Sequence, residues 1–204
     1  MDSAALENLL RRQPRLWRGR RAEQTTGPVI ATGFPDLDAA LPGGGWPLGA
    51  LLEIRIPCLG VGELRLLLPA LCAISRSGRH LAWVAPPHRP YAPALLQAGV
   101  DLAQVLVVES CGEADIPWTL EKLLRSGACG AVLAWPRSLA DHQARRLQLA
   151  AEESQALAVL FLLAGGGSPH AALRLKLQPL PEGLGVDLLK ARGSLQRGSL
   201  VLAV

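Results

Sequence analysis

Between residues 51 and 163 the sequence alternates regularly between short apolar runs and longer helical segments. The apolar runs are continuous, which is typical of strands that are covered on both faces of a sheet. Strands that alternate with helices form βαβ units, whose right-handed crossovers make the strands parallel. The expected strands cover residues 51–56, 81–85, 105–109, 131–135 and 158–163, and the expected helices cover 63–77, 90–99, 117–126 and 139–155.

The helical pattern stops after residue 170. Apolar segments at 173–177, 185–190 and 199–204 are separated by turn residues, which predicts antiparallel strands. The expected fold class is therefore α/β, with a central, mostly parallel sheet flanked by helices and with antiparallel strands at the C-terminus.

Residues 1–24 differ from the rest and are interpreted as a basic helical arm with a linker, while residues 25–204 form the core. The arm combines a leucine stripe with crowded arginines and one tryptophan: Leu6, Leu9, Leu10, Arg11, Arg12, Arg15, Trp17 and Arg18. The leucines could dock on a protein groove. Alternatively, the arginines could contact phosphates while Trp17 stacks on a base. A simply solvated basic arm is the third interpretation.

Composition restricts the remaining functions. The formal net charge of +4 allows contact with nucleic acid but does not demand it. The four cysteines form no C-x-x-C pair and no histidine lies at zinc-ligand spacing, so no metal is expected. No apolar stretch is long enough to span a bilayer, and a cytoplasmic protein without a membrane contact is expected.

The loop after the first expected strand is the natural position for a phosphate-binding loop, because ligands of α/β sheets lie at the carboxyl ends of strands. Such a loop needs the pattern G-x-x-x-x-G-K-[ST]. Residues 57–63 keep Gly60 and Gly62 but contain neither lysine nor Ser/Thr, and Glu63 adds a negative charge. At roughly 4 Å, like charges repel by about 4 kcal/mol at an effective dielectric constant of ~20. The sequence predicts that nucleotide does not bind here.

Two further strand ends lack the carboxylates that an ATPase of this kind uses for metal binding and water activation. The strand at 131–135 ends in Trp135 and Pro136, and the strand at 81–85 is followed by Pro86 and Pro87. We therefore expect no enzymatic activity, no catalytic residue and no cofactor.

A longer pattern resembles a known group of proteins. Residues 31–38, ATGFPDLD, and 41–49, LPGGGWPLG, resemble the segment that leads into the core of RecA-type ATPases. Residues 60–71, GVGELRLLLPAL, are similar to the loop and helix of the ImuA family. This resemblance implies a RecA-like core that lacks Walker motifs, and a role in SOS-induced translesion DNA synthesis.

The resemblance also implies partners. An ImuB-type Y-family polymerase homologue and RecA are the expected ones, and self-association and DNA contact remain open. Lys190 and Arg192 resemble the basic pair with which one RecA subunit reaches its neighbour, which implies a subunit interface; two ordinary surface cations are the alternative. A cell-division inhibitor of the SulA type, which binds the division GTPase, and a DNA-binding module acting through the arm are the alternative functions.

Overall fold

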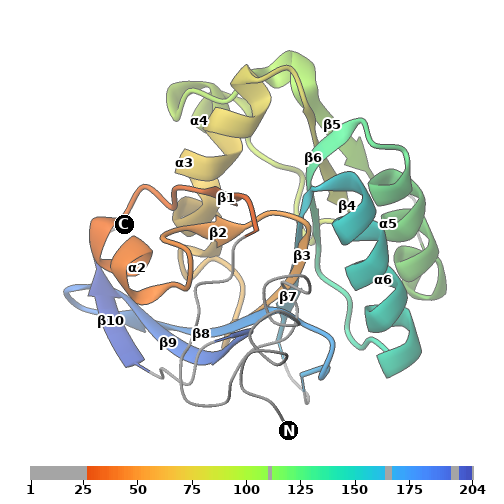
Figure 1. Ribbon diagram of the computed structural model, residues 1–204. Helices are drawn as coiled ribbons and strands as arrows, with labels where there is room; N and C mark the ends of the chain where they lie inside the picture. Colours follow the sequence, from red (N-terminus) through yellow and green to blue (C-terminus); the bar gives the residue numbers. More distant parts are fainter. Residues whose placement is uncertain (1–26, 110–111, 164–166, 194–197, 204) are drawn as a thin grey trace, which may run out of the picture.

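The computed structural model describes residues 27–109, 112–163, 167–193 and 198–203. Its centre is an eight-stranded sheet with strand order β10-β9-β8-β3-β7-β6-β4-β5 (Figure 1). The strands are β3 (Ala50–Arg55), β4 (His80–Val84), β5 (Val105–Val108), β6 (Cys129–Ala134), β7 (Leu157–Leu162), β8 (Leu173–Leu180), β9 (Gly183–Ala191) and β10 (Gly198–Leu202). A separate ribbon pairs β1 (Val29–Ile30) with β2 (Trp46–Pro47).

The parallel part of the sheet runs from β5 through β4, β6, β7 and β3 to β8, and only β9 and β10 are antiparallel to their neighbours. The predicted α/β class with a mostly parallel sheet is confirmed. One detail differs from the expectation of antiparallel strands after residue 170. β8 pairs in parallel with β3, since the chain crosses back to the sheet before it turns into the β8–β9 hairpin.

Helices cover the two faces of the sheet. One face carries α2 (Pro35–Ala40), α3 (Glu63–Arg76) and α4 (Ala92–Gln97), and the other carries α5 (Ile116–Arg125) and α6 (Asp141–Ser154). Short 3-10 turns, η1 (Leu102–Gln104) and η2 (Glu113–Asp115), precede β5 and α5. Figure 1 shows α5 and α6 together on one side, away from β8, β9 and β10. Within the described residues, the part of the sheet formed by β8, β9 and β10 therefore carries helices on one face only.

Alternation along β3 explains this two-layer arrangement. Leu52 and Ile54 point into the core under α3, whereas Leu51 points into the core under α5 and α6. All three side chains are fully buried. The predicted pattern of continuous apolar strands thus reflects burial on both faces.

Gln148 of α6 fastens the second layer to β3. Its Oε1 accepts the Leu51 N–H at 2.9 Å, and its Nε2 donates to the Gly49 carbonyl at 3.2 Å. The side chain is buried, so these bonds satisfy polar backbone groups that water does not reach.

Within the described residues, no helix is long and apolar enough to cross a membrane. The same part of the chain holds no group of three or more His, Cys, Asp or Glu side chains placed to bind a metal ion.

Candidate functional site

The loop at residues 57–62 joins the carboxyl end of β3 to the first residue of α3, which is the predicted phosphate-loop position. Gly60 and Gly62 both have positive φ angles, 81° and 102°, which glycine adopts without the steric cost that a Cβ adds. The loop therefore has the sharp backbone of a strand-to-helix turn. The side chain of Glu63, the first residue of α3, decides which groups this loop can bind.

Glu63 folds back into this loop. Its Oε1 accepts the Gly60 N–H at 3.1 Å, and its side chain is buried. Backbone N–H groups of such a loop are the donors that would cradle a phosphate. Here a carboxylate of the chain itself takes one of them and places a negative charge in the same position. The absence of nucleotide binding, expected from Gly60, Gly62 and Glu63, stays a prediction.

Apolar groups stand at the neighbouring strand ends. Trp135 follows β6, and its ring stacks on Phe161 of β7 with centroids 4.9 Å apart and planes inclined by 20°. Ala85 follows β4 with a φ of 45°, an uncommon angle for a residue with a Cβ. Neither position offers a carboxylate for metal or water.

A buried ionic network lies in the adjoining part of the sheet, and it was not predicted. Glu53 of β3 accepts from Arg174 Nε of β8 at 2.8 Å and from the Ser168 N–H at 2.9 Å. Arg174 also donates to the Ser168 carbonyl at 2.6 Å. A glutamate within the apolar run of residues 51–56 is the sequence signal that could have revealed it, because buried carboxylates need partners.

Lys190 and Arg192, predicted at a subunit interface, lie on and just after β9 beside this network. Lys190 Nζ donates to the Pro169 carbonyl at 2.6 Å, and Arg192 Nη1 lies 3.2 Å from Glu152 Oε1 of α6. Burial, followed by the charges of Arg174 and Arg192, lowers the pKa of Lys190. Both cations hold intramolecular contacts that a neighbouring subunit would have to replace.

The predicted docking residues of the arm lie outside the described residues. These are Leu6, Leu9, Leu10, Arg11, Arg12, Arg15, Trp17 and Arg18. Their role stays a prediction.

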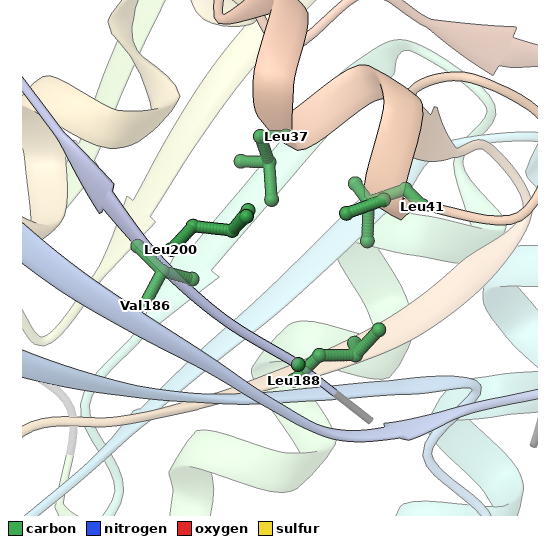
Figure 2. A pocket seen from close by; sticks show the side chains of 7 residues that line it. Leu37, Leu41, Val186, Leu188 and Leu200 are labelled. Atoms are coloured by element: carbon green, nitrogen blue, oxygen red, sulfur yellow. The ribbon is translucent and has the colours of Figure 1, made fainter. Parts of the chain in front are cut away.

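A cavity of about 230 Å³ opens between α2 and the β9–β10 hairpin (Figure 2). Leu37 and Leu41 point into it from α2, opposite Val186, Leu188 and Leu200. The lining is aliphatic and holds no titratable side chain, so this cavity can take up apolar groups but has no acid, base or nucleophile.

The fold and the loop together define a class: an α/β protein with a mostly parallel sheet, in which Glu63 accepts a hydrogen bond from the loop between β3 and α3. The family model described as "Cell division inhibitor SulA" matches residues 60–158, from this loop to the start of β7.

The chain is similar to Protein ImuA of Caulobacter vibrioides (strain NA1000 / CB15N), with 28% identity over 176 residues. That match covers 78% of this chain and 72% of the relative. Cell division inhibitor SulA of Yersinia pestis (strain Pestoides F) is 31% identical over 88 residues, with 43% of this chain and 52% of the relative covered. The resemblance to ImuA predicted from the sequence is confirmed.

A solved structure, SulA from Pseudomonas aeruginosa, aligns with a TM-score of 0.46 and 27% identity. It covers 55% of this chain and 97% of that one.

Proposed function

We propose that this chain is a non-catalytic accessory protein of SOS-induced translesion DNA synthesis. It acts by binding an ImuB-type polymerase homologue, RecA or both, through a RecA-like core that turns over no nucleotide. The observation that carries the proposal is the similarity to ImuA over 78% of the chain. The closed loop at Glu63 supports it, because a scaffold without a phosphate site remains suited to holding other proteins.

The interface within this proposal has two parts. The leucine stripe of the arm, Leu6, Leu9 and Leu10, would dock in a groove of a RecA-like partner. Lys190 and Arg192 would reach an acidic or phosphate group of that partner. A chain that offers these groups but has a closed nucleotide site would bind a RecA filament at one end and stop its extension.

The test uses purified full-length protein with RecA on single-stranded DNA, read as filament length by electron microscopy and as strand exchange. We expect shorter filaments and slower exchange with the wild type. Lys190→Ala plus Arg192→Ala should remove most of that effect. Arg137→Ala plus Arg145→Ala is the matched control, because it removes two exposed cations elsewhere on the molecule.

Binding to the ImuB-type protein is measured separately by biolayer interferometry with the same variants and with Leu6→Asp plus Leu10→Asp. No binding to either protein by the wild type contradicts the proposal. An unchanged filament effect in the Lys190 and Arg192 variant contradicts only the interface assigned to them.

The match of residues 60–158 to the SulA model favours a second function, inhibition of cell division through the division GTPase. It is weaker, since the similarity to SulA of Yersinia pestis covers 43% of this chain while the similarity to ImuA covers 78% of it. Assembly of the purified GTPase, followed by light scattering, separates the two. Inhibition at stoichiometric concentrations, without any effect on RecA, would establish the second function.

A further inference from the structure

Two cations lie side by side on the helix-free part of the sheet. Arg55 is the last residue of β3 and stands opposite Lys176 of β8 in their parallel register. Residues opposite each other point to the same face, and neighbouring strands are about 4.8 Å apart. Like charges at such separations repel, and an anion placed between them would relieve that repulsion.

Two carboxylates lie near this pair on the same face of the sheet, and each accepts hydrogen bonds from other residues. Glu53 binds Arg174 and the Ser168 N–H. Asp187, which stands opposite Lys176 in the β8–β9 register, accepts from Gln178 Nε2 at 3.0 Å and from Ser199 Oγ. Neither carboxylate is bonded to Arg55 or Lys176 in the described part of the chain.

Arg55, Arg174, Lys176 and Lys190 against Glu53 and Asp187 give these six residues of the face a formal charge of +2. The face therefore attracts anions.

Arg55 is half-buried, and its Nε has no hydrogen-bond partner among the described groups. A buried guanidinium N–H without an acceptor is unfavourable, and guanidinium groups form strong hydrogen bonds with oxyanions. Lys176, by contrast, is exposed, so its ammonium is accessible to a ligand in solvent.

The positive charge extends along the same face. Arg174 stands opposite Lys190 in the β8–β9 register. Arg174 lies two residues before Lys176 on β8, so the two side chains point to the same face. Burial lowers the pKa of Lys190, and the charges of Arg174 and Arg192 lower it further, against an opposite effect of Glu53. Cations thus outnumber carboxylates on this face of β3, β8 and β9.

The side chains around these cations decide between a nucleic acid and an acidic protein. Gln178 and Ser199 are polar, and Val201 is the exposed large apolar residue of β10. Cores of protein interfaces are depleted of lysine and are built around buried aromatic anchors. Arginine and lysine on an open polar surface fit phosphates instead, since guanidinium binds phosphate bidentately.

We infer that the face centred on Arg55 and Lys176 binds the phosphodiester backbone of single-stranded nucleic acid. Arg55 and Lys176 are not among the residues predicted for the arm or for the loop at residues 57–62. Binding at this face does not depend on the proposed accessory function, because it requires neither RecA nor a polymerase.

The experiment titrates the full-length protein into a fluorescein-labelled thymidine oligonucleotide of about 20 nucleotides, a length that exceeds common single-strand site sizes. Fluorescence anisotropy is measured at several KCl concentrations. Arg55→Gln plus Lys176→Gln should weaken binding at least tenfold at low salt. The slope of log K against log salt should fall by about 1.4, as expected for two lost single-strand phosphate contacts.

Arg137→Gln plus Arg145→Gln removes the same charge from other exposed positions and should change affinity less than threefold. Should the Arg55 and Lys176 variant fail to fold by circular dichroism, Lys176→Gln alone serves, because its side chain is exposed. It should lower the slope by about 0.7.

Five outcomes overturn the inference. Three are no binding of the oligonucleotide by the wild type, an unchanged slope in the variant, and an equal loss in the control. The fourth is equal competition by polyglutamate at matched charge, which would assign the face to an acidic protein. The fifth is competition by inorganic phosphate or ATP at micromolar concentrations, which would assign it to a small anion.

Discussion

Glu53 and Arg174 show how much a single residue can decide in this chain. The exposed fractions of their side chains are 2% and 15%, and their ion pair joins β3 to β8. Removing one member of a buried pair leaves the other charge without compensation, which costs more than the pair contributes when intact. Glu63 is a second residue with a large local effect, because its carboxylate accepts a hydrogen bond within the loop at residues 57–62.

Replacement of Glu53 by alanine should lower the free energy of unfolding by about 3–5 kcal/mol, because Arg174 then stays buried without its carboxylate. Urea denaturation followed by circular dichroism measures this change. Glu109→Ala is the control: Glu109 pairs with Arg89 on the surface and should leave the urea midpoint unchanged. A loss below about 1 kcal/mol in the Glu53 variant would show that the network contributes little.

Titration with a fluorescent ATP analogue should show no saturable binding to the wild type, since Glu63 holds the Gly60 N–H and the loop has no lysine. Glu63→Gln should also fail to bind, because removing the repulsion does not add the missing cation. Saturable binding by the wild type at micromolar concentration, abolished by Gly62→Asp, would contradict the closed loop.

Among the elements, α2 and the segment before it depend on close packing against α3. Thr32 is buried and donates its N–H to Asp38 Oδ1 at 2.9 Å, which ties the segment to the first turns of α2. Gly33 has a φ of 87°, and a Cβ at this position would lie 2.5 Å from the Pro69 Cβ of α3. Thr32-Gly33 and Leu37-Asp38 therefore have a structural role, because they dock this segment against the rest of the fold.

Gly33→Ala should destabilise the protein by at least about 1 kcal/mol, the lower range for a residue with a Cβ in a disfavoured backbone region. The contact with Pro69 adds to that cost. Thermal unfolding compares it with Gly27→Ala, for which no atom lies within 4 Å of the added Cβ. Equal melting temperatures of the two variants would exclude the proposed packing constraint.

The two outer helices are joined by a titratable group. Glu121 of α5 lies 3.1 Å from Arg125 Nε and 2.5 Å from Arg146 Nη2 of α6. Burial raises the pKa of Glu121, but the hydrogen bonds and charges of Arg125 and Arg146 outweigh it and leave the pKa below its ordinary value.

Because the folded state holds this carboxyl ionised more readily than the unfolded state, its stabilising contribution is present above the unfolded pKa of about 4.3 and is lost as the pH falls through the folded pKa. Glu121→Gln should therefore weaken the dependence of stability on pH below about 4.5. Urea midpoints measured from pH 7 to pH 3 check this, and parallel curves for variant and wild type would contradict it.

At the scale of the whole molecule, β8 decides whether the sheet is complete. It lies between β3 and β9, and Leu173, Leu175 and Leu177 are buried in the core beneath α2 and α3. The SulA model matches only residues 60–158, a region without β3 and β8. Without β8, β3 would become an edge strand that carries the unpaired Glu53.

A chain shortened to residues 25–163 should accordingly fail to form a rigid core. We expect a loss of the near-ultraviolet circular dichroism of Trp46 and Trp83, both fully buried in the intact chain, and a broad urea transition. A cooperative transition with native near-ultraviolet signal would show that the C-terminal strands are an appendage.

The sequence by itself determined the order and type of the main elements, because continuous apolar runs and helical periodicity are local signals. It also predicts a loop that does not bind nucleotide, since the absence of lysine and the presence of Glu63 are local features, and this stays a prediction. The tertiary structure alone decided that β8 pairs in parallel with β3, that Glu53 meets Arg174, and that Arg55 stands beside Lys176. These pairs join residues more than a hundred positions apart, so their contacts depend on strand order and register, which a local pattern does not encode.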